Sequence, residues 1–189
     1  MKTARFRIEG VRPLFLHNGD LANPLNQYAR SLKGLTSKRK KTDADLMEIA
    51  KMEWFGGLYP QGGKPEIVIP GKMIRKCLIQ GARKDKLGKQ MEVAVIPPAD
   101  VPLIYEGPKD PEKLWDSGEF TSIEPVGVNQ SKTIRCRPKF QKWSVEIELE
   151  YLEDLVNEAQ VQQAFAKAGR EVGLGDWRPL YGLFQVTNL

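Results

Sequence analysis

The chain has 189 residues, 41% of them hydrophobic, and its 29 Lys and Arg exceed its 24 Asp and Glu to give a formal net charge of +5. This length predicts a single domain, residues 1–189, with enough apolar side chains for a packed core. No run of about 18 apolar residues occurs, so no membrane-spanning helix is predicted. The single histidine and two distant cysteines offer no ordinary His/Cys zinc site, and we expect a reduced, cytoplasmic protein without cofactors.

The N-terminal region alternates charged and apolar side chains. This alternation predicts a half-buried strand at 3–9 rather than the apolar segment of a signal peptide. A second extended apolar run occupies 14–16. The next residues, 17–20, contain Asn-Gly and predict a turn.

A helical insertion is predicted at about 21–65. Helices are expected at 25–35 and 42–55, the second capped by Thr42. Four consecutive cations lie in the loop between these helices and are candidates for ordering on a polyanion: Lys38, Arg39, Lys40 and Lys41. The alternative is a solubilising loop.

A buried strand at 67–69 passes through Pro70 directly into a predicted helix. The apolar stripe of that helix includes Gly81, which would allow the helix to lie close to a sheet. The start of a helix carries partial positive charge and N–H groups without intrahelical partners, so it suits phosphate. The candidate phosphate-binding residues here are Gly71, Lys72, Arg75 and Lys76. An ordinary strand-to-helix turn with solvated lysines is the alternative.

Apolar strands are predicted at 91–96 and 101–106, a helical turn at 110–115 and an irregular loop at 121–131. A basic β-hairpin is predicted at about 132–151, because both arms alternate apolar and charged residues. The cations of its first arm could track a nucleic-acid backbone, or could pair with the glutamates of the second arm. These cations are Lys132, Arg135, Arg137 and Lys139.

The C-terminal region predicts a helix at 157–172, a glycine-rich break at 173–177 and a final strand at 181–187. The recurring order of strand, helix and strand predicts an α+β fold. We expect a ferredoxin-like, RRM-like core of split β-α-β type, with the helical insertion and the hairpin attached to it.

Basic residues are segregated along the chain. Residues 30–41 contain six Lys or Arg and no acid, residues 72–89 contain seven against one acid, and residues 132–142 contain five and none. Three such runs in one small protein favour a polyanion-binding surface. Each run alone is also typical of a solvated loop or helix face.

Three landmarks, in order along the chain, resemble the RAMP superfamily. They are Leu-Phe-Leu-His-Asn-Gly at 14–19, Ile-Val-Ile-Pro-Gly-Lys-Met-Ile-Arg at 67–75 and the glycine-rich stretch at 173–184. The similarity is greatest to the backbone subunits that bind crRNA in CRISPR effector complexes. A phage- or prophage-encoded stand-alone relative is an interpretation that the resemblance leaves open.

The chain departs from the RAMP pattern at two landmarks. Lys72 and Met73 replace the usual serine pair, and the segment after Gly182 lacks the second glycine and the arginine. The resemblance implies a fold that binds RNA or another single strand, and association with copies of itself or with sister subunits along that strand.

Two further groups of residues are candidates. Trp143 and Trp177 could stack on bases, with Arg178 beside the latter, although most aromatics in this sequence are better interpreted as core. His17 and Asp20 are weak catalytic candidates, since an aspartate in the corresponding loop of some RAMP subunits cleaves target RNA.

We therefore expect a non-enzymatic protein that binds single-stranded nucleic acid, RNA in preference to DNA, through backbone phosphates. Two alternatives are a metal-dependent endoribonuclease that uses Asp20, and a phage-encoded scaffold or single-stranded DNA-binding protein.

Overall fold

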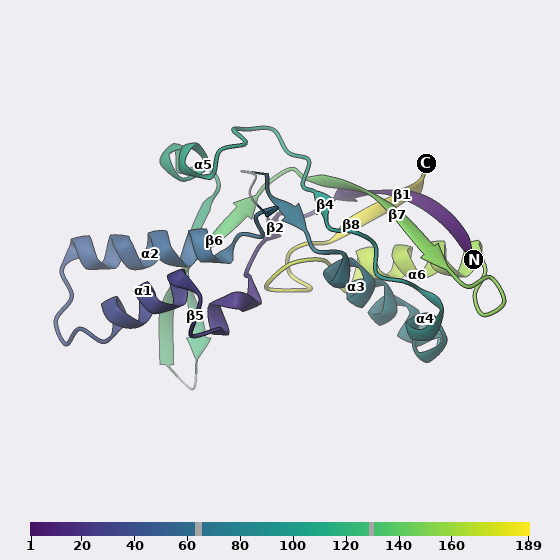
Figure 1. Cartoon of the computed structure of the whole chain (residues 1–189), viewed down its shortest axis with the longest axis horizontal. Helices are drawn as coiled ribbons and strands as arrows, with labels where there is room; N and C mark the ends of the chain where they lie inside the picture. Colours follow the sequence, from purple (N-terminus) through teal and green to yellow (C-terminus); the bar gives the residue numbers. More distant parts are fainter. Residues whose placement is uncertain (63–65, 129–130) are drawn as a thin grey trace. The chain divides into compact units, whose positions relative to one another are not determined.

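The computed structural model describes residues 1–62, 66–128 and 131–189 and has a mixed α+β architecture, which confirms the predicted class at this level (Figure 1). The chain divides into two compact units. The first combines Met1–Phe15, Pro60–Glu106 and Phe140–Leu189, and the second combines Leu16–Tyr59 and Gly107–Lys139. Most of the insertion predicted at 21–65 thus belongs to the second unit, together with the distant segment Gly107–Lys139.

A three-stranded sheet and two long helices dominate the first unit. The elements of this unit are β1 (Lys2–Gly10), β2 (Leu14–Phe15), β3 (Val68–Ile69), α3 (Gly71–Arg83), α4 (Gly88–Ala94), β4 (Val101–Pro102), β7 (Ser144–Tyr151), α6 (Glu158–Glu171) and β8 (Phe184–Asn188).

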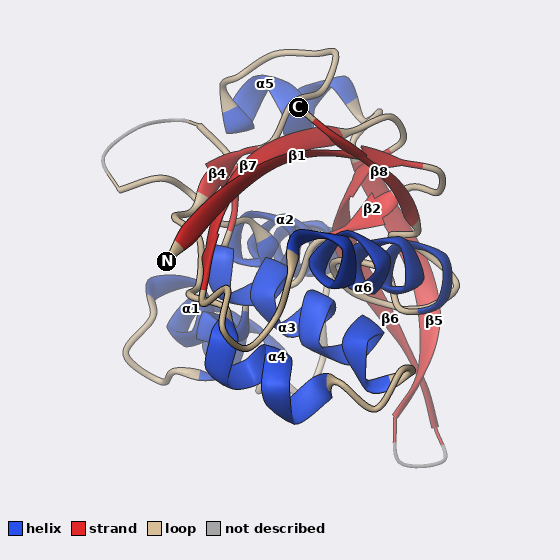
Figure 2. Ribbon diagram, turned by 90° about the vertical axis from the view of Figure 1, so that its right-hand side faces the viewer, coloured by secondary structure: helices blue, strands red, loops and turns tan. Residues whose placement is uncertain are grey.

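Strand β1 lies between β7 and β8 and is antiparallel to both, with Phe6 opposite Ile147 on one side and Asn188 on the other. Strands β7 and β8 are consequently parallel, and α6 connects them. This connection is a split β-α-β arrangement. Helices α3 and α6 cover the same face of the curved sheet (Figure 2).

The core of the first unit lies between this sheet and the two helices. Ala4, Phe6 and Ile8 of β1 are at most 7% exposed, and the ring centroids of Phe6 and Phe165 lie 5.1 Å apart. Helices α3 and α6 approach closely at Gly81, where an added Cβ would lie 2.2 Å from the Ala164 carbonyl oxygen. Gly81 therefore allows contact with a helix, and not with a sheet as its position in the sequence suggested.

The opposite face of the sheet carries ion pairs between neighbouring strands. Arg5 of β1 lies 2.7 Å from Glu148 of β7, and Arg7 lies 3.4 Å from Glu146. The glutamates of β7 thus pair with β1. The hairpin predicted at 132–151 is not formed, because β6 (Ser131–Phe140) pairs with β5 (Thr121–Val128) and β7 pairs with β1. Alternation along a strand indicates its two faces but not its partner.

The second unit combines helices with most of the β5–β6 ribbon. Its helices are η1 (Gly19–Ala22), α1 (Gln27–Thr36), α2 (Asp43–Gly57) and α5 (Pro111–Ser117). The positions of α1 and α2 confirm both predicted helices to within two residues, and Thr42 and Asp45 form a capping box at the start of α2. Trp54 of α2 is fully buried, and its Nε1–H donates to the Phe120 carbonyl at 2.9 Å.

Two further predicted segments are wrong. The strand expected at 91–96 is replaced by helix α4, in which Met91 and Ala94 are buried at helical spacing. The irregular loop expected at 121–131 is mostly strand β5. Pro125 and Gly127 are unusual within a strand, but β5 lies at the edge of its sheet beside β6, and an edge strand tolerates them. Across the described residues, the helices lack the length and apolar character needed to cross a membrane.

Candidate nucleic-acid interface

Helix α3 presents a basic stripe on the side that faces away from the core. Its apolar stripe, including Ile74, Cys77 and Leu78, is buried. Lys72, Lys76 and Arg83 follow one another at i, i+4 and i+11, so they line the same side of the helix. The helical period that places the apolar residues in the core thus places these cations together along about 16 Å of helix.

Two adjoining cavities follow this stripe. One, of about 470 Å³, is lined by Lys72, Arg75, Lys76, Ile79, Gln80, Arg83, Glu92 and Pro97. The other, of about 380 Å³, is lined by Gln80, Arg83, Lys84, Glu171, Val172, Arg178 and Pro179. The cavities share Gln80 and Arg83, and we call them together the α3 groove.

The charge of the α3 groove is strongly positive. Within the described part of the chain, Lys72, Lys76 and Arg83 form no ion pair with an acid. The negative charge of Glu171 is balanced by two neighbouring cations. Arg170 donates a hydrogen bond to its carboxylate and Lys84 lies 3.6 Å away, so the pKa of Glu171 is lowered. Glu92 is the other acid of the lining.

Arg178 reaches the groove from the glycine-rich loop. Its Nη1 donates to Gln80 Oε1 at 3.1 Å and to the Gly173 carbonyl at 3.3 Å. The loop can turn here because Gly173 and Gly182 adopt φ of +79° and +71°. An added Cβ at Gly182 would lie 1.8 Å from the Leu174 carbonyl oxygen. The space beside Gly182 is therefore filled by the backbone of Leu174.

The start of α3 differs from the expected open phosphate cradle. The Gly71 N–H donates to the Asp100 carboxylate at 2.9 Å, and an added Cβ at Gly71 would lie 1.7 Å from the Pro98 carbonyl oxygen. The 98–100 loop therefore covers this end, and a carboxylate already occupies the place that a phosphate would take.

The Arg75 side chain is not simply surrounded by solvent, because its guanidinium donates hydrogen bonds to backbone carbonyls. Its Nε donates to the Val95 carbonyl at 2.8 Å, and its Nη2 donates to the Glu92 carbonyl. These carbonyls lie at the end of α4, where intrahelical partners are lacking. Arg75 thus fixes α4 to α3 while still lining the α3 groove.

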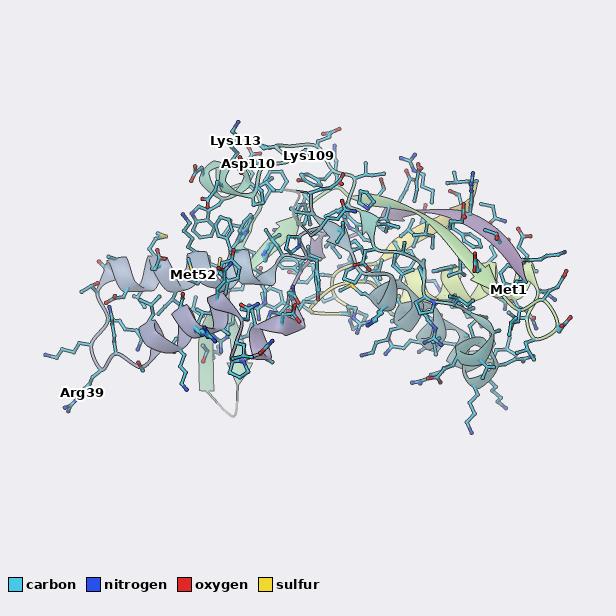
Figure 3. All side chains as sticks on the ribbon, viewed as in Figure 1. Met1, Arg39, Met52, Lys109, Asp110 and Lys113 are labelled. Atoms are coloured by element: carbon cyan, nitrogen blue, oxygen red, sulfur yellow. The ribbon has the colours of Figure 1, made fainter. Side chains whose placement is uncertain are left out.

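The cations at 38–41 lie in the second unit, on the loop between α1 and α2. Arg39 and Lys40 are exposed, and Arg39 points away from the loop (Figure 3). Lys38 is paired with Asp45 at 2.6 Å, and Lys41 donates to the Lys38 carbonyl. Two of the four side chains therefore remain extended into solvent.

The cations of β6 do not form the expected basic face. Arg135 lies 2.6 Å from the buried carboxylate of Glu53. Arg137 is only 7% exposed and Lys139 is half-buried, while Lys132 is exposed. Alternation in the sequence does not reveal the pairing of Arg135 with Glu53 or the burial of Arg137.

Both tryptophan candidates are held by the fold. Trp143 is 5% exposed, and its Nε1–H donates to the Arg12 carbonyl at 2.9 Å. Trp177 packs on Phe15 and Tyr181, with ring centroids 4.9 and 6.4 Å apart. The Trp143 ring is thus mostly enclosed, which leaves little of its surface for contact with a base.

The two catalytic candidates lie near each other in sequence at the start of the second unit. Asp20 is exposed in η1, and the His17 carbonyl accepts a hydrogen bond from Tyr59. Among the described residues, no group of three or more His, Cys, Asp or Glu side chains is placed to hold a metal ion.

Sequence reasoning missed two features. Glu92 and Pro97 enter the groove only through tertiary structure, whereas the helical spacing of Lys72 and Lys76 could have indicated the stripe that also carries Ile79 and Gln80. The second unit has an apolar cavity of about 320 Å³ between α2 and the β5–β6 ribbon. Its walls include Met47 and Ile134, which are 62% and 60% exposed.

Comparison of the sequence with models of known protein families gave no match, and comparison with curated proteins gave none.

Proposed function

We propose that the chain is a non-enzymatic binder of single-stranded nucleic acid, RNA in preference to DNA, and that the strand lies in the α3 groove. The observation that carries the proposal is a row of cations, Lys72, Lys76 and Arg83, that form no ion pair with an acid among the described residues and that Arg178 extends. Cations in such a row hold phosphates without reading sequence.

A ferredoxin-like, RAMP-like core is the fold that we propose for the first unit. The split β-α-β connection of β7, α6 and β8 around β1 supports it. RRM proteins bind bases on the open face of their sheet. Here that face carries the pairs Arg5–Glu148 and Arg7–Glu146, which favours the α3 side as the binding surface.

In a cell the chain would act as one subunit of a ribonucleoprotein or filament, beside copies of itself or sister subunits. The length of the α3 groove supports this interpretation. About 16 Å of helix matches about four or five phosphates of a stacked strand, so one chain covers only a short segment.

Fluorescence anisotropy with labelled 30-nucleotide RNA and DNA tests the proposal. Contacts with about four phosphates predict that the logarithm of the association constant falls with the logarithm of salt concentration with a slope of about −3. Tighter binding of RNA than of DNA is the expected order. Absence of binding to both strands at low salt would reject the proposed function.

A further inference from the structure

We propose that the larger cavity of the α3 groove holds one nucleobase, stacked on the guanidinium of Arg75, in addition to the phosphates held by the lysines. This inference rests on the proposed function and adds a base-binding subsite to it. The cavity of about 470 Å³ lies within the range of sites that enclose small molecules, about 300–1,000 Å³.

Arg75 is the planar group in this cavity. Its guanidinium is held by the Val95 and Glu92 carbonyls and its side chain is half-buried, so the plane is fixed before a ligand arrives. Arginine planes stack on unpaired bases, and a fixed plane loses little conformational entropy on binding.

Apolar atoms continue this surface. Ile79 and Pro97 line the same cavity, and Ile79 is only 5% exposed. A cavity that served phosphate alone would gain nothing from them, because a charged phosphate is not stabilised by apolar contact. Apolar contact beside a planar cation instead suits the face of a base.

Gln80 supplies a polar group at the edge of the cavity. Arg178 donates to its Oε1, and a guanidinium has no acceptor, so the amide oxygen faces Arg178. The Nε2 group of Gln80 has no hydrogen-bond partner among the described residues. It is therefore available to donate to a carbonyl or ring nitrogen of a base.

The charges around the cavity match the two parts of a nucleotide. Lys72, Lys76 and Arg83 would hold phosphate oxygens. The Glu92 side chain is exposed and would repel phosphate, but it can accept a hydrogen bond from a donor of a base, either an exocyclic amino group or a ring N–H such as N3–H of uracil. A lining with both features fits a nucleotide unit better than a phosphate alone.

A ten-nucleotide oligouridine and an abasic strand of equal length and charge test the inference by fluorescence anisotropy. The abasic strand should bind about five- to thirtyfold more weakly, the effect of losing one or two contacts of about 1 kcal/mol each. Equal affinities would overturn the base subsite and leave the phosphate proposal standing. Failure of both strands to bind would overturn the phosphate proposal together with this inference.

Two variants locate the effect. Arg75→Lys keeps the charge and loses the plane, and Gln80→Ala removes the amide; each should weaken oligouridine binding about threefold or more and leave abasic binding unchanged. Gln163→Ala, at an exposed glutamine of α6, is the matched control. Equal losses for oligouridine and abasic strands in both variants would assign these residues to phosphate binding or to folding and overturn the inference.

Discussion

The Arg178 guanidinium lies 3.1 Å from the Gln80 side-chain oxygen, and this contact joins the C-terminal glycine-rich loop to the middle of α3. Residues 98 positions apart are thereby brought to one groove. The contact places a cation beside the lysines of α3 and fixes the orientation of the Gln80 amide. The α3 groove thus combines the basic stripe of α3 with residues that tertiary structure brings beside it.

The close packing of α3 on α6 predicts that Gly81→Ala destabilises the protein. The new Cβ would lie 2.2 Å from the Ala164 carbonyl oxygen, so the helices must separate. We expect a loss of about 1–3 kcal/mol in the free energy of unfolding, measured by urea denaturation. Gly34→Ala in α1 is the matched control, since nothing lies within 4 Å of its added Cβ, and it should stabilise by up to about 1 kcal/mol. Similar effects for the two variants would contradict the α3–α6 contact.

The buried carboxylate of Glu53 fastens α2 to β6. It accepts hydrogen bonds from Arg135 at 2.6 Å and from the Cys136 N–H at 2.8 Å. Glu53→Ala leaves both donors without their acceptor and should cost about 3 kcal/mol. Glu148→Ala removes an exposed pair with Arg5 and should cost less than about 1 kcal/mol. Equal unfolding midpoints for the two variants would refute this assignment.

Asp45 makes the start of α2 sensitive to acid. A hydrogen bond from Lys38, followed by hydrogen bonds from Thr42, lowers the pKa of Asp45 from 3.8 to about 2. Because the folded-state pKa is the lower one, the stabilising contribution is complete above pH 3.8 and is lost as the pH falls through about 2. NMR titration of the Asp45 carboxyl should give the low pKa in the native chain and a value closer to 3.8 in Lys38→Ala. An unchanged pKa in that variant would rule out the pair.

Neither cysteine should react in the folded protein. Burial raises the pKa of Cys77 to about 12, and burial together with the charge of Glu53 raises the pKa of Cys136 to about 12. The thiolate is the reactive form. We expect labelling by a thiol reagent at pH 8 to be slow in the native state and rapid for both residues in urea. Rapid labelling of the native protein would show that these sites open readily.

Local patterns predicted much of the secondary structure. Strand β1 and helices α1, α2, α3 and α6 follow from side-chain periodicity and capping residues that act within a few positions. The partner of β6 could not be predicted, because alternation gives the faces of a strand without its neighbour. The same limit hid the burial of Arg137 and the enclosure of Trp143.

The candidate site was predicted in part. Lys72 and Lys76 were identified from their position on α3, and they line the groove. Two kinds of hydrogen bond could not be predicted. The Gly71 N–H donates to the Asp100 carboxylate, and the Arg75 guanidinium donates to backbone carbonyls at the end of α4. Both are contacts with residues about 20–30 positions away that give no local signal. The α3 groove itself depends on such contacts.

Charge reversal in the α3 groove tests the central proposal most directly. Anisotropy with a labelled 30-nucleotide RNA should compare the native chain, the double variant Lys72→Glu with Lys76→Glu, and the control Lys33→Glu with Lys113→Glu, which makes the same charge change at exposed lysines of the second unit. The α3 variant should bind at least about tenfold more weakly, with a salt slope shallower by about 1.4, while the control stays within about twofold. Equal loss of affinity in both variants, or none in the α3 variant, would contradict binding in the groove.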